Sequence, residues 1–215
     1  MTATLRPVLE AREIHKSFRR RHVLCGASLA VRPGELVAVV GENGAGKSTL
    51  LKILAGTLAA DSGDVSLSGT LGYCPQEPVV NENLSVDQHL RYFAAAYRLP
   101  TFDRADELVC QLGFSRYRHD AVGSLSGGTR QKLNLALALL HDPDVVLLDE
   151  PYQGFDWDTY LRFWDLAAQL RARGKAVVII THLVFEQDRF DLLADLAAGR
   201  LTPRTPAGKD RHASN

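Results

Sequence analysis

The sequence predicts an α/β fold with a mostly parallel core sheet, an N-terminal antiparallel β-subdomain and a helical subdomain. Apolar runs rich in β-branched residues at 36–40, 145–149 and 175–181 are typical of buried parallel strands. A glycine-rich loop at 41–48 follows the first run and precedes an amphipathic segment. A long stretch of helical pattern at 85–141 separates the first of these strands from the other two, and it is predicted to form the helical subdomain.

The remaining elements follow from turn and cap signals. Glycine and proline end most segments, and Ser85 is placed to cap the first helix of the central region. The predicted strands are 8–18, 23–31, 63–68, 70–74 and a hairpin at 192–201, and the predicted helices are 49–56, 85–99, 103–112, 129–141 and 158–173. Residues 1–202 are therefore predicted to form one domain with a helical subdomain at 84–141, and 203–215 to form a disordered tail.

Composition and charge are those of an ordinary globular protein. Apolar residues make up 46% and charged residues 23%, and 25 basic residues balance 25 acidic ones. This balance gives no net field for non-specific binding of nucleic acid or an anionic membrane. Cys25, Cys74 and Cys110 lie far apart, without zinc spacing, and are expected to be reduced thiols.

The start of the chain lacks the charged and apolar regions of a signal peptide, and no apolar run approaches the roughly 20 residues of a membrane-spanning helix. We therefore expect a cytoplasmic protein. Any function at a membrane would need another chain to cross it.

The glycine-rich loop carries a phosphate-binding motif. It matches GxxxxGK[ST] between a strand and a helix, which is the context of a P-loop NTPase. Its backbone N–H groups and the helix N-terminus attract phosphates, Lys47 adds a positive charge, and Ser48 is placed to bind Mg²⁺. The candidate nucleotide-binding residues are Gly41, Glu42, Asn43, Gly44, Ala45, Gly46, Lys47, Ser48 and Thr49.

Two acids complete this predicted site. Asp149 ends the apolar run 145–149, where an acid of P-loop enzymes holds magnesium. Glu150 follows and is a candidate for orienting or deprotonating the attacking water. The chain has no Asn-Lys-x-Asp sequence for reading guanine, so ATP is the expected nucleotide.

Beyond these motifs, the sequence resembles ATP-binding cassette (ABC) ATPases over most of its length. Leu125-Ser126-Gly127-Gly128-Thr129 is similar to the family signature LSGGQ. Its glycines and the Ser126 cap expose N–H groups at a helix N-terminus. The resemblance implies that Ser126, Gly127 and Gly128 bind the γ phosphate held by a second ATPase subunit, so that two nucleotides lie between two head-to-tail domains.

The resemblance also implies roles for four separate residues. Gln76 resembles the Q-loop glutamine that senses magnesium and water, and His182 resembles the switch histidine on the γ phosphate. Asp156 resembles the D-loop aspartate at the dimer interface. Phe18 occupies the place of the aromatic residue that stacks on adenine, usually a tyrosine. Taken singly, each of these residue types is more often structural.

Three residues depart from the family pattern. Thr129 replaces the signature glutamine, and Tyr152 and Phe155 are bulky residues before the D-loop aspartate. We expect the Ser126 and Gly128 contacts to persist, whereas Tyr152 and Phe155 beside Glu150 reshape the interface.

The resemblance implies the ATP-hydrolysing subunit of an ABC transporter at the inner face of the membrane, with a separate permease and a second ATPase subunit, expected to be an identical copy. Residues 76–97 are the expected permease-docking surface, and the segment 75–86 favours export. One alternative is a soluble ABC ATPase acting on nucleic acid, ribosomes or chromosomes, which usually carries inserts or a second cassette. A P-loop kinase is the other alternative, but it has no use for the signature segment.

Overall fold

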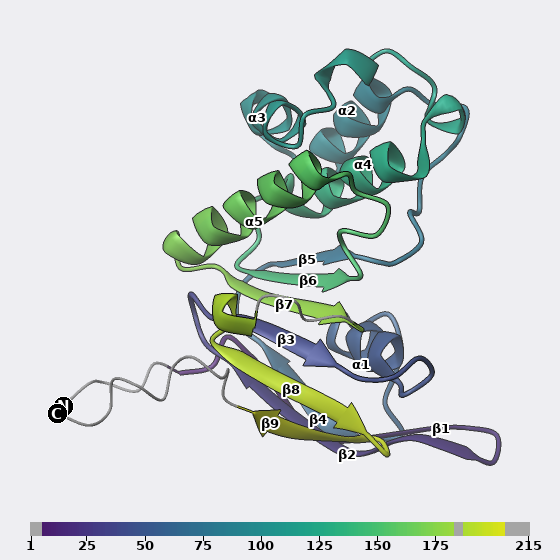
Figure 1. The fold of residues 1–215 in the computed structure, drawn as a ribbon, viewed down its shortest axis with the longest axis vertical. Coiled ribbons are helices and arrows are strands. Elements are labelled where there is room, and N and C mark those ends of the chain that lie inside the picture. The colour runs from purple at the N-terminus through teal and green to yellow at the C-terminus, as the bar shows by residue number, and fades with distance from the viewer. Residues whose placement is uncertain (1–5, 183–186, 205–215) are drawn as a thin grey trace, which may run out of the picture.

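The computed structural model describes residues 6–182 and 187–204, which form strands and helices (Figure 1). The strands are β1 (Leu9–Phe18), β2 (Arg21–Val31), β3 (Leu36–Val40), β4 (Ser62–Leu67), β5 (Leu71–Cys74), β6 (Val145–Asp149), β7 (Ala176–Thr181), β8 (Leu192–Ala197) and β9 (Arg200–Arg204). The α-helices are α1 (Lys47–Leu54), α2 (Val86–Ala96), α3 (Asp103–Gln111), α4 (Gly127–Leu139) and α5 (Trp157–Ala172). Short 3₁₀ helices are η1 (Ser115–Tyr117), η2 (Val122–Ser124) and η3 (Gln187–Arg189).

The larger sheet confirms the predicted, mostly parallel core. Its strand order is β5-β6-β7-β3-β8-β9, and in the described part of the chain only β9 runs antiparallel to its neighbour. The carboxyl ends of β5, β6, β7 and β3 lie at one edge of the sheet. The segments that follow Cys74, Asp149, Thr181 and Val40 therefore meet at that edge, where ligands of such sheets bind.

Both faces of this sheet are covered, which explains its continuous apolar strands. Val146 and Leu148 of β6 belong to the core beneath α4 and α5, whereas Val145 and Leu147 belong to the core shared with α1 and the N-terminal sheet. Figure 1 shows α4 and α5 stacked over β5 and β6. The alternation of side chains along each strand thus divides one sheet between two cores.

The predicted antiparallel sheet is also confirmed. Its strand order is β2-β1-β4, and Leu9 pairs with both Val31 and Leu67. The backbone N–H of Cys25 donates to the carbonyl of Gly199 at 2.8 Å, which joins this sheet to the β8–β9 turn.

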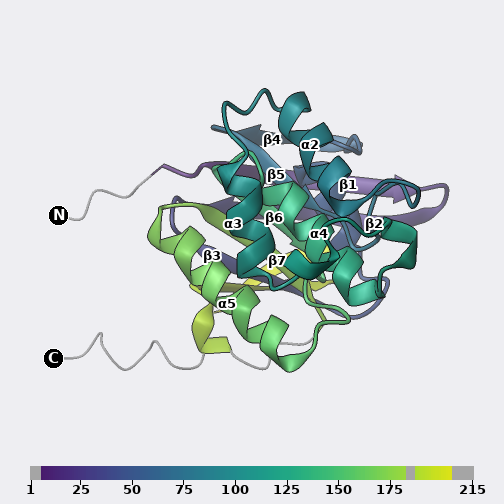
Figure 2. The ribbon, with the colours of Figure 1, turned by 90° about the horizontal axis from the view of Figure 1, so that it is seen from above.

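The central helices α2, α3 and α4 group together on the side of the core sheet where β5 lies (Figures 1 and 2). Ser85 caps α2, and its side chain and that of Gln88 form the reciprocal bonds of a capping box. Helix α4 begins at Gly127, two residues before the predicted start. The reason is that Ser126 Oγ accepts a hydrogen bond from the Thr129 N–H and so defines the cap there.

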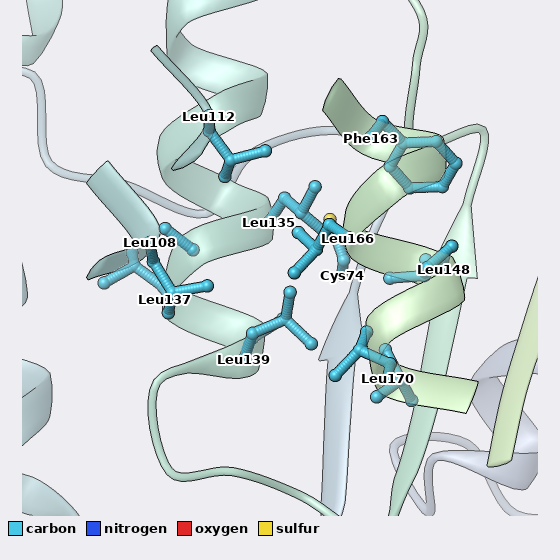
Figure 3. Packing of buried hydrophobic residues seen from close by; sticks show 14 of the residues in the cluster. Cys74, Leu108, Leu112, Leu135, Leu137, Leu139, Leu148, Phe163, Leu166 and Leu170 are labelled. Atoms are coloured by element: carbon cyan, nitrogen blue, oxygen red, sulfur yellow. The ribbon is translucent and has the colours of Figure 1, made fainter. Parts of the chain in front are cut away.

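Helix α4 packs tightly between the core sheet and the other helices. Figure 3 shows Leu135 of α4 near Cys74 of β5 and Leu166 of α5, all of them buried. A Cβ on Gly72 would lie 2.2 Å from the carbonyl oxygen of Ala138, so only glycine permits this approach of α4 to β5.

The last strand extends past the predicted hairpin. Strand β9 continues through Arg204, which pairs with Leu193 of β8, two residues beyond the predicted domain end at 202. Residues 205–215 of the predicted tail lie outside the described residues. In the described part of the chain, every helix is too short or too polar to cross a lipid bilayer.

Candidate active site

The glycine-rich loop connects β3 to α1 at the carboxyl edge of the sheet. Gly46 precedes α1 with φ 103°, a conformation that favours glycine, and a Cβ there would lie 2.8 Å from Val23 Cγ1. A Cβ on Gly41 would lie 2.6 Å from the carbonyl oxygen of Leu196. The close approach of β2, through Val23, and of β8, through Leu196, therefore forces the loop into its compact shape.

Lys47 is the first residue of α1 and is only 7% exposed. Its Nζ donates hydrogen bonds to the carbonyl oxygens of Gly41 at 2.7 Å and Glu42 at 2.9 Å. The ammonium is thus held inside the loop, beside the N-terminus of α1. A positive side chain and a helix N-terminus together form a site for a polyphosphate.

Asp149 ends β6 and is 2% exposed. Burial raises the pKa of its carboxyl group, an effect opposed by a hydrogen bond from Ser48 and by the charges of Lys47 and Lys52, and reinforced by Glu150. Its buried Oδ1 has no hydrogen-bond partner among the described residues. A buried carboxylate oxygen without a partner, beside a serine hydroxyl, fits the hard oxygen ligands that Mg²⁺ requires.

Glu150 is placed by an unusual backbone conformation. Its φ is 49°, in the left-handed region that non-glycine residues rarely adopt, and its N–H donates to the carbonyl of Ile180 at 3.0 Å. Its Oε1 lies 2.7 Å from Nδ1 of His182, and the Glu150 side chain is 9% exposed against 46% for His182. Strained residues of this kind concentrate at functional sites.

The structure brings most of the predicted nucleotide-site residues together. They line a cavity of about 190 Å³ with Asn43, Gly44, Gly46, Lys47, Ser48, Thr49, Gln76, Asp149 and Glu150 in its wall. Gln76 reaches the cavity from the segment after β5, and its Nε2 donates to Gln153 Oε1 at 3.4 Å.

The signature segment lies in a different place. Ser126 caps α4, Asp156 caps α5 by accepting the Thr159 N–H at 2.8 Å, and a Cβ on Gly128 would lie 2.4 Å from the Gly154 carbonyl oxygen. The bonds from Thr159 hold the pKa of the Asp156 carboxyl below its usual value. Ser126, Gly128 and Asp156 line a second cavity, of about 540 Å³, whose wall contains none of the phosphate-loop residues. Gly127 lies beside it at the start of α4.

Phe18 lies apart from both cavities, at the end of β1. Phe18 is 47% exposed, and Lys16 Nζ lies 5.6 Å from its ring centroid. Arg21, the cross-strand partner of Phe18, donates from Nη2 to the Gly44 carbonyl at 2.9 Å. The β1–β2 turn therefore contacts the phosphate loop through Arg21.

The comparison with protein families decides the identity of this arrangement. The model described as "ABC transporter" matches residues 24–153, which include the phosphate loop, the signature segment and both acids. The chain belongs to the ABC transporter family. It is the ATP-binding, ATP-hydrolysing domain of that family, which confirms the resemblance to ABC ATPases seen in the sequence.

Relatives of this ABC ATPase include transporter subunits from bacteria. An ABC transporter ATP-binding protein of Bacillus subtilis is 34% identical over 92% of this chain and 69% of the relative. The Nod factor export ATP-binding protein I of Burkholderia pseudomallei is 34% identical over 84% of this chain and 64% of the relative.

Solved structures agree with the fold of this ABC ATPase. The ATP-binding subunit of an ABC transporter superposes with a TM-score of 0.85 at 27% identity, covering 92% of this chain and 90% of that one. A bacterial ABC transporter cassette described as dimeric gives a TM-score of 0.84 at 22% identity, covering 93% and 99%.

The structure shows contacts of this ABC ATPase site that the sequence analysis did not predict. Tyr152 packs edge-on against Tyr160 and Phe163, and burial raises its pKa to about 12. Phe155 likewise packs against the core. The contact of Arg21 with the loop was missed because it depends on strand pairing, and the run of three arginines at 19–21 was its only signal in the sequence.

Proposed function

We propose that this chain is the energy-coupling subunit of an ABC exporter, in which Mg·ATP bound at the phosphate loop is completed by the signature segment of a second copy. The separation of the two cavities within one chain carries this proposal. Lys47 lies at one cavity and Ser126 at the other, so no single chain surrounds a nucleotide with both. Head-to-tail pairing of two chains satisfies both half-sites at once.

In the proposed site, Phe18 stacks on adenine and the residues from Gly41 to Thr49 bind the phosphates. Ser48, Asp149 and Gln76 would hold Mg²⁺, which supplies charge neutralisation at the β and γ phosphates when bound. The buried, unpartnered Oδ1 of Asp149 supports this assignment.

For hydrolysis, Glu150 accepts a proton from the attacking water, and His182 orients the Glu150 carboxylate through the 2.7 Å contact. Ser126, Gly127 and Gly128 of the second copy donate hydrogen bonds to the γ phosphate, with Asp156 beside them at the interface. The helix N-terminus at Gly127 favours the negative charge there.

A separate membrane permease is the proposed partner. A groove of about 710 Å³ lies between the phosphate-loop helix and the helical subdomain, and its wall includes Gln76, Val79, Phe93 and Tyr97. Val79 is 78% exposed, which is unusual for an apolar side chain and suits contact with another protein. A chain docked at this groove would lie at the inner face of the membrane. The relatives whose names include export support transport out of the cell.

Ser126→Arg is expected to lower ATP turnover at least about a hundredfold while the Kd for ATP changes less than about twofold. The larger cationic side chain fills the cap position of α4, where the γ phosphate of the second copy binds, but lies away from Lys47. Steady-state hydrolysis and fluorescent-nucleotide titration measure the two effects. The matched control is Ser124→Arg, at an exposed serine two residues earlier. Full turnover in Ser126→Arg would contradict the two-chain site.

The partner is tested by purification from the native host. A tagged Glu150→Gln chain, trapped with Mg·ATP, is expected to recover a multi-spanning protein in stoichiometric amount from solubilised membranes. Adding Val79→Asp is expected to remove that protein, because a charge in the groove opposes apolar docking.

Val65→Asp is the control, since Val65 is an exposed valine of β4 that does not line the groove. Recovery from the soluble fraction alone, with ribosomes or DNA, would contradict the exporter assignment. Retention of the membrane protein in the Val79→Asp variant would show that the groove is not the docking site.

A further inference from the structure

Two polar side chains are buried in the middle of the signature helix. Gln131 and Asn134 of α4 are 4% and 6% exposed, and their neighbours Leu133 and Leu135 are fully buried. A buried carboxamide is costly unless its N–H groups and oxygen find partners. An apolar residue at position 134 would satisfy the packing of this helix, so the partners of Asn134 indicate what it contributes.

The partners of Asn134 lie in the segment that leads to Gln76. Its Nδ2 donates to the carbonyl oxygen of Pro75 at 2.8 Å and to Cys74 Sγ at 3.2 Å, and more weakly to Gln131 Oε1 at 3.5 Å. Gln131 Nε2 donates to the same sulfur at 3.8 Å. Burial raises the pKa of the Cys74 thiol, which therefore remains neutral.

These bonds join two parts of the proposed mechanism. Helix α4 begins at the signature glycine Gly127, and Asn134 lies two turns further along it. Pro75 immediately precedes Gln76, which lines the phosphate-loop cavity. Among the described residues, Asn134 is the residue of α4 whose side chain bonds directly to the backbone next to Gln76.

We infer that Asn134 is a positioning residue for Gln76. By holding the Pro75 carbonyl, it fixes where the carboxamide of Gln76 stands relative to Asp149 and Glu150, and it transmits a displacement of α4 to that carboxamide. The inference rests on the proposed role of Gln76, but the bond to Pro75 is a property of the chain without nucleotide. Asn134 is absent from the wall of the phosphate-loop cavity, and it lines the neighbouring groove of about 710 Å³ together with Gln76. Its bonds to Cys74 and Pro75 make it a positioning residue for Gln76.

Asn134→Leu tests this inference, because leucine has a similar volume and cannot donate to Pro75. We expect kcat for ATP to fall about tenfold, while KM and the Kd for ATP stay within about twofold. Leu133→Ala is the matched structural control: it removes buried apolar volume from the same helix, so it is expected to lower Tm and leave kcat unchanged below its own melting temperature.

A double-mutant cycle separates positioning from general damage. If Asn134 acts through Gln76, Asn134→Leu has no further effect on kcat in a Gln76→Ala background. A tenfold loss that persists in that background would overturn the inference, as would an unchanged kcat in the single variant.

Hydrogen exchange tests the hold on the loop without any nucleotide. The amides of β5, which pairs with β6 up to Cys74 directly before Pro75, are expected to exchange at least about tenfold faster in Asn134→Leu than in the wild type and in Leu133→Ala. Unchanged exchange would overturn the inference. If the wild type fails to hydrolyse ATP but its amides still exchange more slowly than those of Asn134→Leu, the proposed function is contradicted. The bond of Asn134 to Pro75 would then still be shown to order this segment.

Discussion

Lys47→Ala is expected to weaken ATP binding at least about a hundredfold, which corresponds to about 2.7 kcal/mol. The variant loses the ammonium that faces the β and γ phosphates, and it also loses the bonds that Nζ makes to Gly41 and Glu42. Removing both the charge and the support of the loop makes this the largest expected effect on affinity.

Isothermal titration of ATP against the purified chain measures this effect. Lys175→Ala is the matched control, because Lys175 bonds the carbonyl oxygen of Asp142 and precedes β7, at the opposite edge of the sheet from the phosphate loop. It is expected to bind ATP within about twofold of the wild type. Ordinary affinity in Lys47→Ala would show that the phosphates bind elsewhere.

Glu150→Gln is expected to lower the rate of ATP hydrolysis at least about a hundredfold and to leave ATP binding almost unchanged. Glutamine keeps the shape and hydrogen-bonding oxygen of Glu150, so it retains a contact to His182 without accepting a proton from water. Because the trapped nucleotide is not hydrolysed, a dimer is expected to accumulate in the presence of Mg·ATP.

Single-turnover hydrolysis and light scattering coupled to size exclusion measure the two consequences. Glu77→Gln, at an acidic residue of the neighbouring groove, makes the same chemical change outside the proposed catalytic position and is expected to keep its turnover. Fast hydrolysis by Glu150→Gln would assign the base to another residue. A slow variant that remains monomeric would contradict the two-chain site while leaving the role of Glu150 intact.

Local patterns were sufficient to predict most of the fold. The apolar β-branched runs became β3, β6 and β7, and Ser85 capped α2 where its side chain was expected. These features depend on neighbours in the sequence, so they can be predicted from periodicity and cap residues. The predicted range 129–141 began two residues late, whereas the Ser126 cap predicted from the signature segment agrees with the observed start of α4 at Gly127.

The composition of the site could be predicted, but its internal contacts could not. The phosphate loop, Asp149 and Glu150 follow from motif and order, whereas the left-handed backbone of Glu150 has no signature in the sequence. Asn134 and Pro75 are 59 residues apart, and their bond follows from the packing of α4 on β5. The inward orientation of Tyr152 likewise depends on the aromatic residues of α5, which only the folded chain brings near it.

The two bonds of Lys47 have a consequence for how the affinity for nucleotide arises. A lysine side chain carries about 2 kcal/mol of rotamer entropy, and in this chain much of that entropy is already lost before a ligand arrives, because Nζ is fixed by two carbonyl oxygens. The ordering cost therefore falls on folding rather than on nucleotide capture. Binding then requires mainly an exchange of acceptors, from backbone carbonyls to phosphate oxygens, at a loop whose shape is set in advance.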